Sequence, residues 1–257
     1  MSEGSRYVFT GRVIPERSNV HIQSLEAHSE YGKLDISIAS SQIQAVLDSE
    51  DGIENIHTAR NSVKSAVHEI LDIFSFTHGY SYSIEITSVT YPNNRHRVFG
   101  VDVGILQNQL EDDERSEMFQ TVLQVIPTED GRYLKRCLKN LRLSTNNPVD
   151  TGLHCYRAIE AIRKYFHSEF DIPDDEGHRS EAWKTLRDEL DVSRSNIEEV
   201  KEYADEPRHG GIVEITDEER ADVFETTWNI ICAFVEYLHE KEDLDPIRVE
   251  MPDSNSA

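Results

Sequence analysis

The chain has 257 residues, and its 49 Asp and Glu outnumber 26 Lys and Arg, which gives a formal net charge of −23 at pH 7. This acidity excludes a generally basic surface, and three scattered cysteines (Cys137, Cys155 and Cys232) exclude a disulfide framework. No apolar run approaches the roughly 18 residues of a membrane helix, and the first residues do not resemble a signal peptide, so we expect a protein of the reducing cytoplasm without membrane contact.

Alternating apolar and polar residues predict strands in the first half of the chain. The predicted strands are 6–14, 20–22 and 34–38, followed later by 80–86 and 99–105. Tyr31–Lys33 lies between the second strand and the third, where it would form a hairpin turn. A polar segment with two arginines, Tyr91–Arg97, connects the last two strands.

Helical patterns follow these strands. Ser41–Gln44 fits a capping box, which predicts a short helix over residues 43–47. Apolar residues three and four apart then predict a long helix over residues 56–74 that ends near Gly79. Two more helices are predicted at 118–123 and 133–143. The order β-β-β-α-α-β-β-α-α indicates an α+β domain with a mainly antiparallel sheet.

The periodicity and the charge both change near Ser144–Pro148, a polar break that suits a domain boundary. Residues 1–145 carry 14 basic and 20 acidic side chains, net −6, whereas residues 146–257 carry 12 and 29, net −17. We therefore predict an α+β domain at 1–145, a helical domain at 146–245 and a flexible acidic tail at 246–257. The acidity fits a protein of a high-salt habitat, and equally an ordinary acidic cytoplasmic protein.

Four amphipathic helices are predicted in the second half. Asp150 is placed to cap the first, which runs to His167, and Trp183 belongs to the second. Capping-box patterns at Ser195–Glu198 and Thr216–Glu219 open the third and fourth, and Pro207 is expected to end the third. Helices with short connections predict an all-α antiparallel bundle.

The junction between the last two helices holds the most unusual segment, Ala204–Gly211, with Arg208 and His209 before two glycines. A guanidinium binds phosphate in a bidentate manner, and an imidazole transfers protons near neutral pH, so the pair is a candidate site for metal-independent phosphodiester cleavage. The alternative is structural, with Arg208 bound to helix-end carbonyls or to a carboxylate and His209 a polar loop residue.

Glu160 bears on that choice. It lies along the apolar stripe of the first bundle helix, seven residues after Leu153. A carboxylate in that position is costly unless a cation compensates it. We therefore predict a Glu160–Arg208 ion pair, with Arg157 and Arg163 as competing partners.

Residues of about 148–240 resemble a HEPN domain, the higher-eukaryote-and-prokaryote nucleotide-binding helical bundle. The resemblance lies in the segment Cys155–Phe166, in the helix with Trp183 and Leu186, and in Arg208–Gly210 before a capped final helix. It implies RNA- or nucleotide-related biology in stress, toxin–antitoxin or phage-defence systems, commonly as a homodimer. Many HEPN members are metal-independent ribonucleases.

The HEPN motif is an Arg followed after four to six residues by a His, and here those positions hold Val213, Glu214 and Ile215. Arg163–His167 has a spacing of three and lies on another helix. The sequence therefore favours a non-catalytic binding or regulatory module, whose acidic bundle could also bind a protein partner. The alternative is an endoribonuclease that uses Arg208 and His209 at a dimer cleft, with Glu214 or the dimer partner supplying the missing group.

A basic helix is the second candidate interface. Its basic residues have helical spacing: Arg132, Lys135, Arg136, Lys139 and Arg142. Residues 131–143 contain no acidic side chain, so this face could bind nucleic-acid phosphates, together with Arg95 and Arg97. In the alternative, the helix packs on the sheet and its basic face meets the acidic bundle.

We predict no metal site and no cofactor. The chain has 11 His, but none of them form HxxxH or HExxH spacing, and no CxxC pair is present. Phosphate-binding glycine loops and nucleophile elbows are also missing from the sequence.

Overall fold

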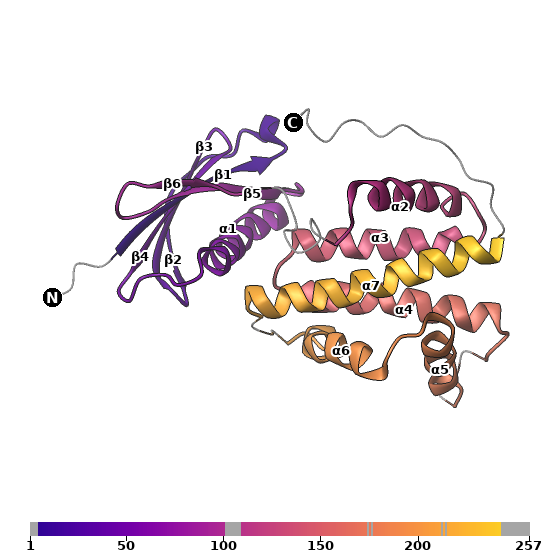
Figure 1. Cartoon of the computed structure of the whole chain (residues 1–257). Coiled ribbons are helices and arrows are strands. Elements are labelled where there is room, and N and C mark those ends of the chain that lie inside the picture. The colour runs from indigo at the N-terminus through magenta and orange to yellow at the C-terminus, as the bar shows by residue number, and fades with distance from the viewer. Residues whose placement is uncertain are drawn as a thin grey trace. The chain divides into compact units, whose positions relative to one another are not determined.

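The structure is a computed structural model, and it describes residues 5–100, 109–173, 175, 177–211, 213 and 215–242. The chain divides into two compact units, Met1–Val101 and Asp102–Ala257. The first is built on a β-sheet and the second consists of helices (Figure 1). The predicted class, an α+β region with an antiparallel sheet followed by a helical region, is confirmed.

The first unit contains one six-stranded sheet with the order β2-β3-β4-β1-β5-β6, in which every pair is antiparallel. The strands are β1 (Ser5–Ile14), β2 (Ile22–Ser29), β3 (Gly32–Ala39), β4 (Gln42–Ser49), β5 (Ser83–Thr90) and β6 (His96–Val98). A 3₁₀ turn, η1 (Glu16–Ser18), follows β1. The predicted hairpin is present, but its turn is Glu30–Tyr31 and not Tyr31–Lys33, because Gly32 and Lys33 already pair with Ser29 and His28 across β3 and β2.

Helix α1 (Ile56–His78) supplies the other half of this unit's core. Every second residue of β1 is buried from Tyr7 to Val13, and the buried side chains of α1 recur at helical spacing from Ile56 to Leu71. These two periodicities are what a sheet and a helix need in order to bury one face each. Gly79 ends the helix with a φ of 69°, as the sequence predicted.

The short helix predicted over residues 43–47 is wrong, because these residues form β4. Ser40 and Ser41 have φ of 50° and 64° and make a tight turn between β3 and β4. The Ser41 hydroxyl accepts a hydrogen bond from the Val20 backbone N–H at 3.0 Å and caps no helix. The period-2 pattern of Ile43, Ala45 and Leu47, all buried, decided the structure.

The second unit contains six helices in the part of the chain that the structure describes. They are α2 (Asp112–Val125), α3 (Gly131–Asn146), α4 (Thr151–Glu169), α5 (Arg179–Leu190), α6 (Arg194–Arg208) and α7 (Asp217–Glu242). Helix α4 is central, and it packs against α3, α5, α6 and α7. None of the described helices is both long enough and apolar enough to cross a membrane.

The boundary predicted at 145/146 is corrected to 101/102. The basic helix α3 belongs to the helical unit, because its buried residues Leu134 and Cys137 share a core with Cys155 and Ile159 of α4. The polar break at Ser144–Pro148 is therefore a helix-to-helix turn inside one unit. The strand predicted at 99–105 is also corrected, because β6 covers His96–Val98, within the predicted turn and the residue after it, and residues 99 and 100 are not in a strand. Residues 101–105 and the predicted tail lie outside the described residues.

Helix ends in the second unit agree partly with the sequence. Thr216 and Glu219 form the predicted capping box of α7. The cap of α6 is Ser193 and not Ser195, since the Ser193 hydroxyl accepts from the Asn196 N–H at 3.1 Å. Pro207 lies inside the last turn of α6, so the helix ends two residues later than expected, at Arg208.

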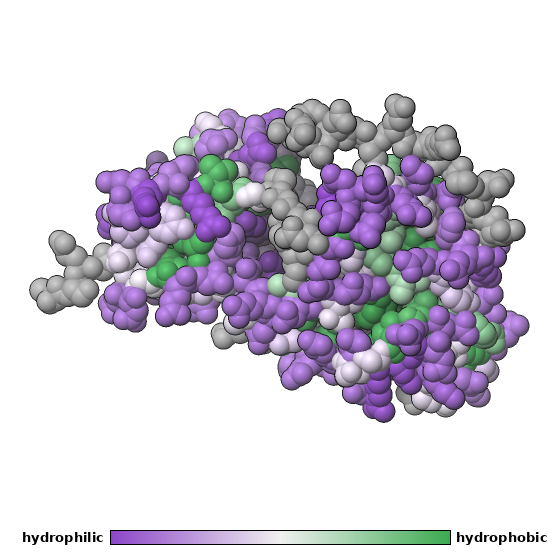
Figure 2. Space-filling view, viewed as in Figure 1, coloured by the Kyte–Doolittle hydropathy of each residue, from purple (hydrophilic) through white to green (hydrophobic). Residues whose placement is uncertain are grey.

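Hydrophilic residues dominate the visible face of both units in Figure 2.

Candidate functional site

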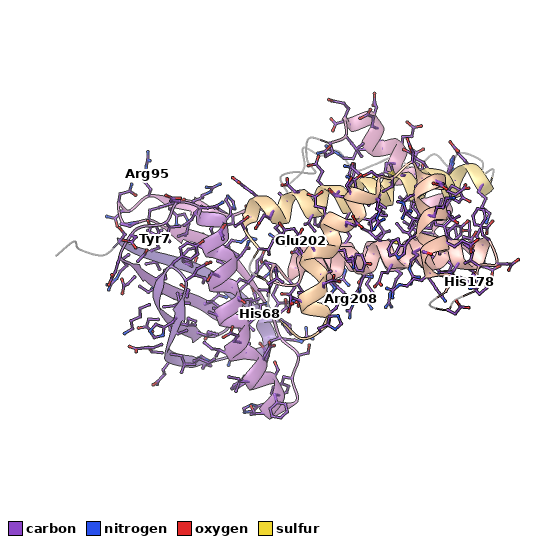
Figure 3. All side chains as sticks on the ribbon, turned by 90° about the horizontal axis from the view of Figure 1, so that it is seen from below. Tyr7, His68, Arg95, His178, Glu202 and Arg208 are labelled. Carbon is purple, nitrogen blue, oxygen red and sulfur yellow. The ribbon has the colours of Figure 1, made fainter. Side chains whose placement is uncertain are left out.

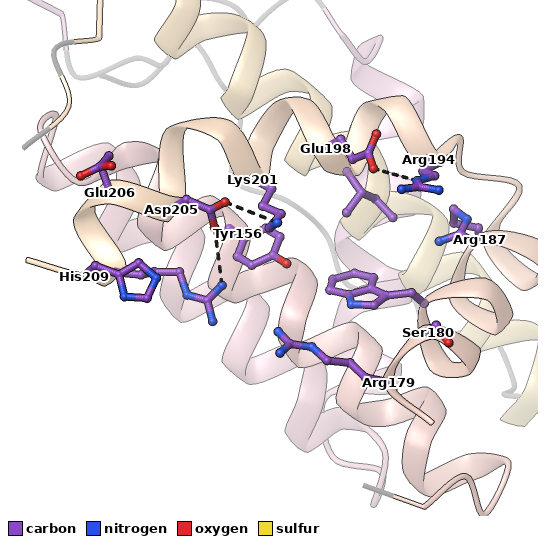
Figure 4. A pocket seen from close by; sticks show the side chains of 13 residues that line it. Tyr156, Arg179, Ser180, Arg187, Arg194, Glu198, Lys201, Asp205, Glu206 and His209 are labelled. Carbon is purple, nitrogen blue, oxygen red and sulfur yellow. Dashed lines mark hydrogen bonds and ion pairs between the residues drawn. The ribbon is translucent and has the colours of Figure 1, made fainter. Parts of the chain in front are cut away.

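A cavity of about 750 Å³ lies between α4, α5 and α6 (Figure 4). It is called the cationic cavity here, because most of its charged lining residues are basic. The lining residues are Tyr156, Arg179, Ser180, Trp183, Arg187, Arg194, Ile197, Glu198, Lys201, Asp205, Glu206, Arg208 and His209. Both sequence-predicted catalytic candidates, Arg208 and His209, line this one cavity.

Regular helical spacing places these side chains. Arg194, Lys201 and Arg208 are seven residues apart on α6, which brings them to one face of the helix. Trp183 follows Arg179 by four residues on α5 and precedes Arg187 by four. Arg187 and Arg194 lie near one end of the cavity and Arg179 lies nearer the other (Figure 4).

The predicted Glu160–Arg208 ion pair is present. Arg208 Nη2 lies 3.3 Å from Glu160 Oε1, with the two side chains 30% and 22% exposed. The Arg208 guanidinium also lies 5.2 Å from the centre of the Tyr156 ring and 4.0 Å from Asp205 Oδ1. Arg208, shown at the end of α6 in Figure 3, is therefore held in place by one ring and two carboxylates.

A second arginine, not expected from the sequence, shares the same carboxylate. Arg179 Nη2 lies 3.8 Å from Glu160 Oε1, the oxygen that Arg208 also approaches. Of the competing partners that the sequence suggested, Arg157 is exposed, and Arg163 lies 5.4 Å from the centre of the Trp183 ring. One carboxylate oxygen therefore faces two guanidinium groups.

His209 caps the C-terminus of α6, and its backbone N–H donates to the Glu206 carbonyl at 3.0 Å. The side chain is exposed, and among the described residues no side-chain hydrogen bond to its ring is present. Gly210 follows with a φ of 85°, a backbone conformation that favours glycine. An exposed imidazole at a helix end is available to a ligand, but nothing in the described surroundings orients it.

The second histidine of the HEPN motif has no equivalent near Arg208 in the described positions, which are Val213 and Ile215. Glu214 lies outside the described residues. His167 is buried, its Nε2 accepts a hydrogen bond from Arg163 Nη1 at 2.9 Å, and it does not line the cavity.

Tyr156 forms part of the cavity wall. Burial raises the pKa of its phenol, and the neighbouring Glu160 carboxylate raises it further. The phenol is therefore protonated at neutral pH and is a hydrogen-bond donor or a ring surface rather than a base.

The basic face of α3 is exposed within the helical unit. All five predicted residues, Arg132, Lys135, Arg136, Lys139 and Arg142, are exposed, while Leu134 and Cys137 are fully buried. Arg132 lies 3.8 Å from Glu129, and for the other four the described part of the chain offers no ion pair. The alternative in which this helix packs on the sheet with its basic face against the bundle does not hold, because its apolar stripe is the part that packs on the other helices.

Arg95 and Arg97 belong to the first unit. Arg95 projects from the turn between β5 and β6 (Figure 3), and Arg97 donates to the His57 ring at 2.9 Å.

Within the described residues, no three His, Cys, Asp or Glu side chains gather as a metal site. Burial lowers the pKa of His154, a scattered histidine of α4.

Some lining residues were not expected from the sequence, although it holds a signal for them. The seven-residue spacing of Arg194, Lys201 and Arg208 is visible in the sequence alone. What the sequence does not show is that Arg179 of α5 and Tyr156 of α4 face this stripe, because that depends on how three helices pack.

The fold and the site define a two-domain protein, a sheet domain followed by a helical domain with a cationic cavity. Residues 7–99 match the N-terminal domain of DUF8168, a domain of unknown function, and residues 119–239 match its C-terminal domain. The chain therefore carries both DUF8168 domains, in order. The second match includes α3, in agreement with the boundary between the two units at 101/102. Neither the curated proteins nor the solved structures contain a match.

Proposed function

We propose that this chain is a non-catalytic RNA-binding module and that the basic face of α3 contacts the RNA phosphates. The observation that carries the proposal is the row of five exposed cations on one helix face, four of them without an ion pair in the described residues, in a chain of net charge −23. Local positive charge on an otherwise acidic protein directs an anionic polymer to one surface.

The position of these cations along α3 supports a binding role. Arg132 and Lys135 lie in the first turns, where the helix dipole is positive and where acidic residues stabilise a helix. Basic residues there cost a few tenths of a kcal/mol each in stability, and they add to the positive potential at the helix end. Helix stability alone gives no reason for this arrangement.

The resemblance to HEPN domains supports RNA as the partner and stress or phage defence as the setting, within the cytoplasm. The matched family models describe no function, so this resemblance remains a prediction. A homodimer is part of the same proposal, and light scattering on the purified protein measures its mass directly.

The alternative function is a metal-independent endoribonuclease that uses Arg208 and His209. Their place in one cavity favours it. The engagement of Arg208 by Glu160 and Asp205 and the apolar residues at 213 and 215 speak against it. General acid–base cleavage needs two proton-transferring groups, and His209 is the only histidine among the described residues that line the cavity.

RNA binding is tested by fluorescence anisotropy of a labelled single-stranded RNA at 50–200 mM salt. Five phosphate contacts predict a slope of about −3.5 in log affinity against log salt, or about a 100-fold loss over this range. The triple variant Lys135→Ala, Arg136→Ala, Lys139→Ala should bind far more weakly, with a slope of about −1.4. A double variant of exposed lysines elsewhere, Lys33→Ala with Lys184→Ala, serves as the control and should match the wild type. An affinity independent of salt would refute the proposal.

Cleavage is tested on the same RNA with wild type, Arg208→Ala and His209→Ala. The proposed binding role predicts an intact RNA in all three samples. Cleavage by wild type that both variants lose, with unchanged circular dichroism, would establish the endoribonuclease instead.

A further inference from the structure

We infer that the cationic cavity binds a small aromatic phosphate monoester, with the phosphate between Arg179 and Arg208 and the ring against Tyr156 and Trp183. This site lies on α4, α5 and α6 and is independent of the basic face of α3. RNA binding could fail while this site holds, and the reverse is equally possible.

The charges at the Arg179 end of the cavity are unequal. Two guanidinium groups approach a single oxygen, Glu160 Oε1, at 3.8 and 3.3 Å. Each guanidinium has five N–H donors in a planar fork, so this oxygen, together with Asp205 Oδ1 at 4.0 Å from Arg208, leaves most of them without an acceptor. A phosphate dianion offers three oxygens and matches that geometry in a bidentate manner.

Charges along the rest of the cavity are mostly matched, apart from Arg187 and the carboxylate of Glu206. Arg194 pairs with Glu198 at 2.7 Å and Lys201 pairs with Asp205 at 3.4 Å, both within α6 (Figure 4). Arg187 lines the cavity without an ion pair in the described part of the chain. Its positive charge adds to the preference for an anion.

The walls favour a ring next to the phosphate. The Tyr156 and Trp183 rings lie 6.0 Å apart with 27° between their planes, and Ile197 adds a buried apolar side chain. Arg208 lies over the Tyr156 ring, an attraction that orients its guanidinium before any ligand arrives. A volume of about 750 Å³ is that of a small-molecule pocket.

Glu160 has an opposing role in this arrangement. Its carboxylate fixes both arginines in the free protein, and it also competes with an incoming anion for their N–H groups. Replacing it by the neutral, nearly isosteric glutamine should therefore raise the affinity for the anion, whereas removing Arg208 should lower it. A purely structural ion pair predicts lower stability in both variants and no opposite effects on binding.

The chain offers a direct reporter, because Trp183 and Trp228 are its only tryptophans and Trp228 does not line the cavity. In a Trp228→Phe background, Trp183 fluorescence is titrated with phenyl phosphate, inorganic phosphate and benzoate. Phenyl phosphate should bind tightest, and each of the other two should bind at least about tenfold more weakly. Equal binding of inorganic phosphate would overturn the role of the rings, and equal binding of benzoate would overturn the choice of phosphate.

The same titration on variants tests the residues. Glu160→Gln should bind phenyl phosphate severalfold more tightly, and Arg208→Ala about tenfold or more weakly. Arg179→Ala, whose side chain is half exposed, gives the same loss if Arg208→Ala does not fold. Lys184→Ala, on α5 outside the cavity lining, is the control and should bind like the parent. Absence of any response in both the parent and Glu160→Gln, or equal affinity in all variants, would overturn the inference.

Discussion

A carboxylate on the packed side of a helix needs a compensating cation, and for Glu160 this rule predicted one of its two arginine partners. The apolar stripe of α4 was enough to predict that Glu160 has an arginine partner, and Arg208 is that partner. The rule did not reveal Arg179, because a carboxylate accepts more than one donor and the sequence does not say which helices supply them.

The contribution of Arg208 to stability is the first residue-scale prediction. Arg208→Ala removes a partly buried ion pair and a ring contact, and it should lower the free energy of unfolding by roughly 1–2 kcal/mol. Arg194→Ala removes an exposed i,i+4 pair and should lower it by at most about 0.5 kcal/mol. Urea unfolding followed by circular dichroism measures both values, and equal values would show that Arg208 has no more than a surface role.

Cysteine reactivity is the second residue-scale prediction. Burial raises the pKa of the Cys137 and Cys155 thiols, and it raises that of Cys232 to about 12, because a thiolate is poorly solvated in the helical core. The native protein should therefore react slowly with a thiol reagent at pH 8, with Cys232 fastest because it is partly exposed. Since the pKa of Cys232 lies above the pH range of this experiment, the rate of its reaction should rise steadily from pH 7 to 10. A plateau near pH 8.5, the value of a free thiol, would contradict this.

At the scale of elements, α4 and α6 approach unusually closely at Gly152. A Cβ placed there would lie 2.5 Å from both the Cβ and the carbonyl oxygen of Tyr203. Only glycine fits, because real atoms of this kind do not approach so closely without a shift of backbone. This contact brings α6, with its row of basic residues, against α4 and so helps to form the cationic cavity.

Gly152→Ala tests that contact. The added methyl group should force α4 and α6 apart and lower the free energy of unfolding by roughly 1–3 kcal/mol. Phenyl phosphate binding, if present, should weaken as well. Ser168→Ala, at an exposed position of the same helix, should change stability by less than about 0.5 kcal/mol. Comparable melting temperatures for the two variants would mean that the helices absorb the methyl group.

Residues 43–47, which the sequence predicted as a short helix, form β4. Ser41–Gln44 fits a capping box, but the same residues begin an alternation that ends at Ser49. A local start signal competes with the pattern of the residues that follow, and here pairing of β4 with both β1 and β3 decided the result. Long helices such as α1 and α7 were predicted well, because their apolar stripes extend over many turns.

For the whole molecule, the two units of the structure differ more in net charge than the two halves that the sequence suggested. Residues 1–101 hold 8 basic and 12 acidic side chains, net −4, and residues 102–257 hold 18 and 37, net −19. Almost all of the excess negative charge lies in the helical unit, which nevertheless contains both the basic face of α3 and the cationic cavity. The contrast in sign within one unit supports treating these two features as binding surfaces.

The boundary itself yields the last prediction. A fragment of residues 102–257 should fold and melt cooperatively, whereas residues 146–257 should not, because removing α3 exposes core residues of α4 such as Cys155 and Ile159. Circular dichroism melts of the two fragments measure this. Cooperative folding of the shorter fragment would restore the boundary that the sequence suggested.

The sequence by itself determined the class of fold, most of the helices and strands, the exposed basic residues of α3 and the Glu160–Arg208 pair, because each depends on periodicity or on the charge balance of one helix. Only the tertiary structure decided that α3 belongs to the helical unit, that β4 is a strand, and that Arg179, Trp183 and Tyr156 meet Arg208 around one cavity. Those outcomes depend on which faces pack together across long separations in the chain, and local patterns do not encode that choice.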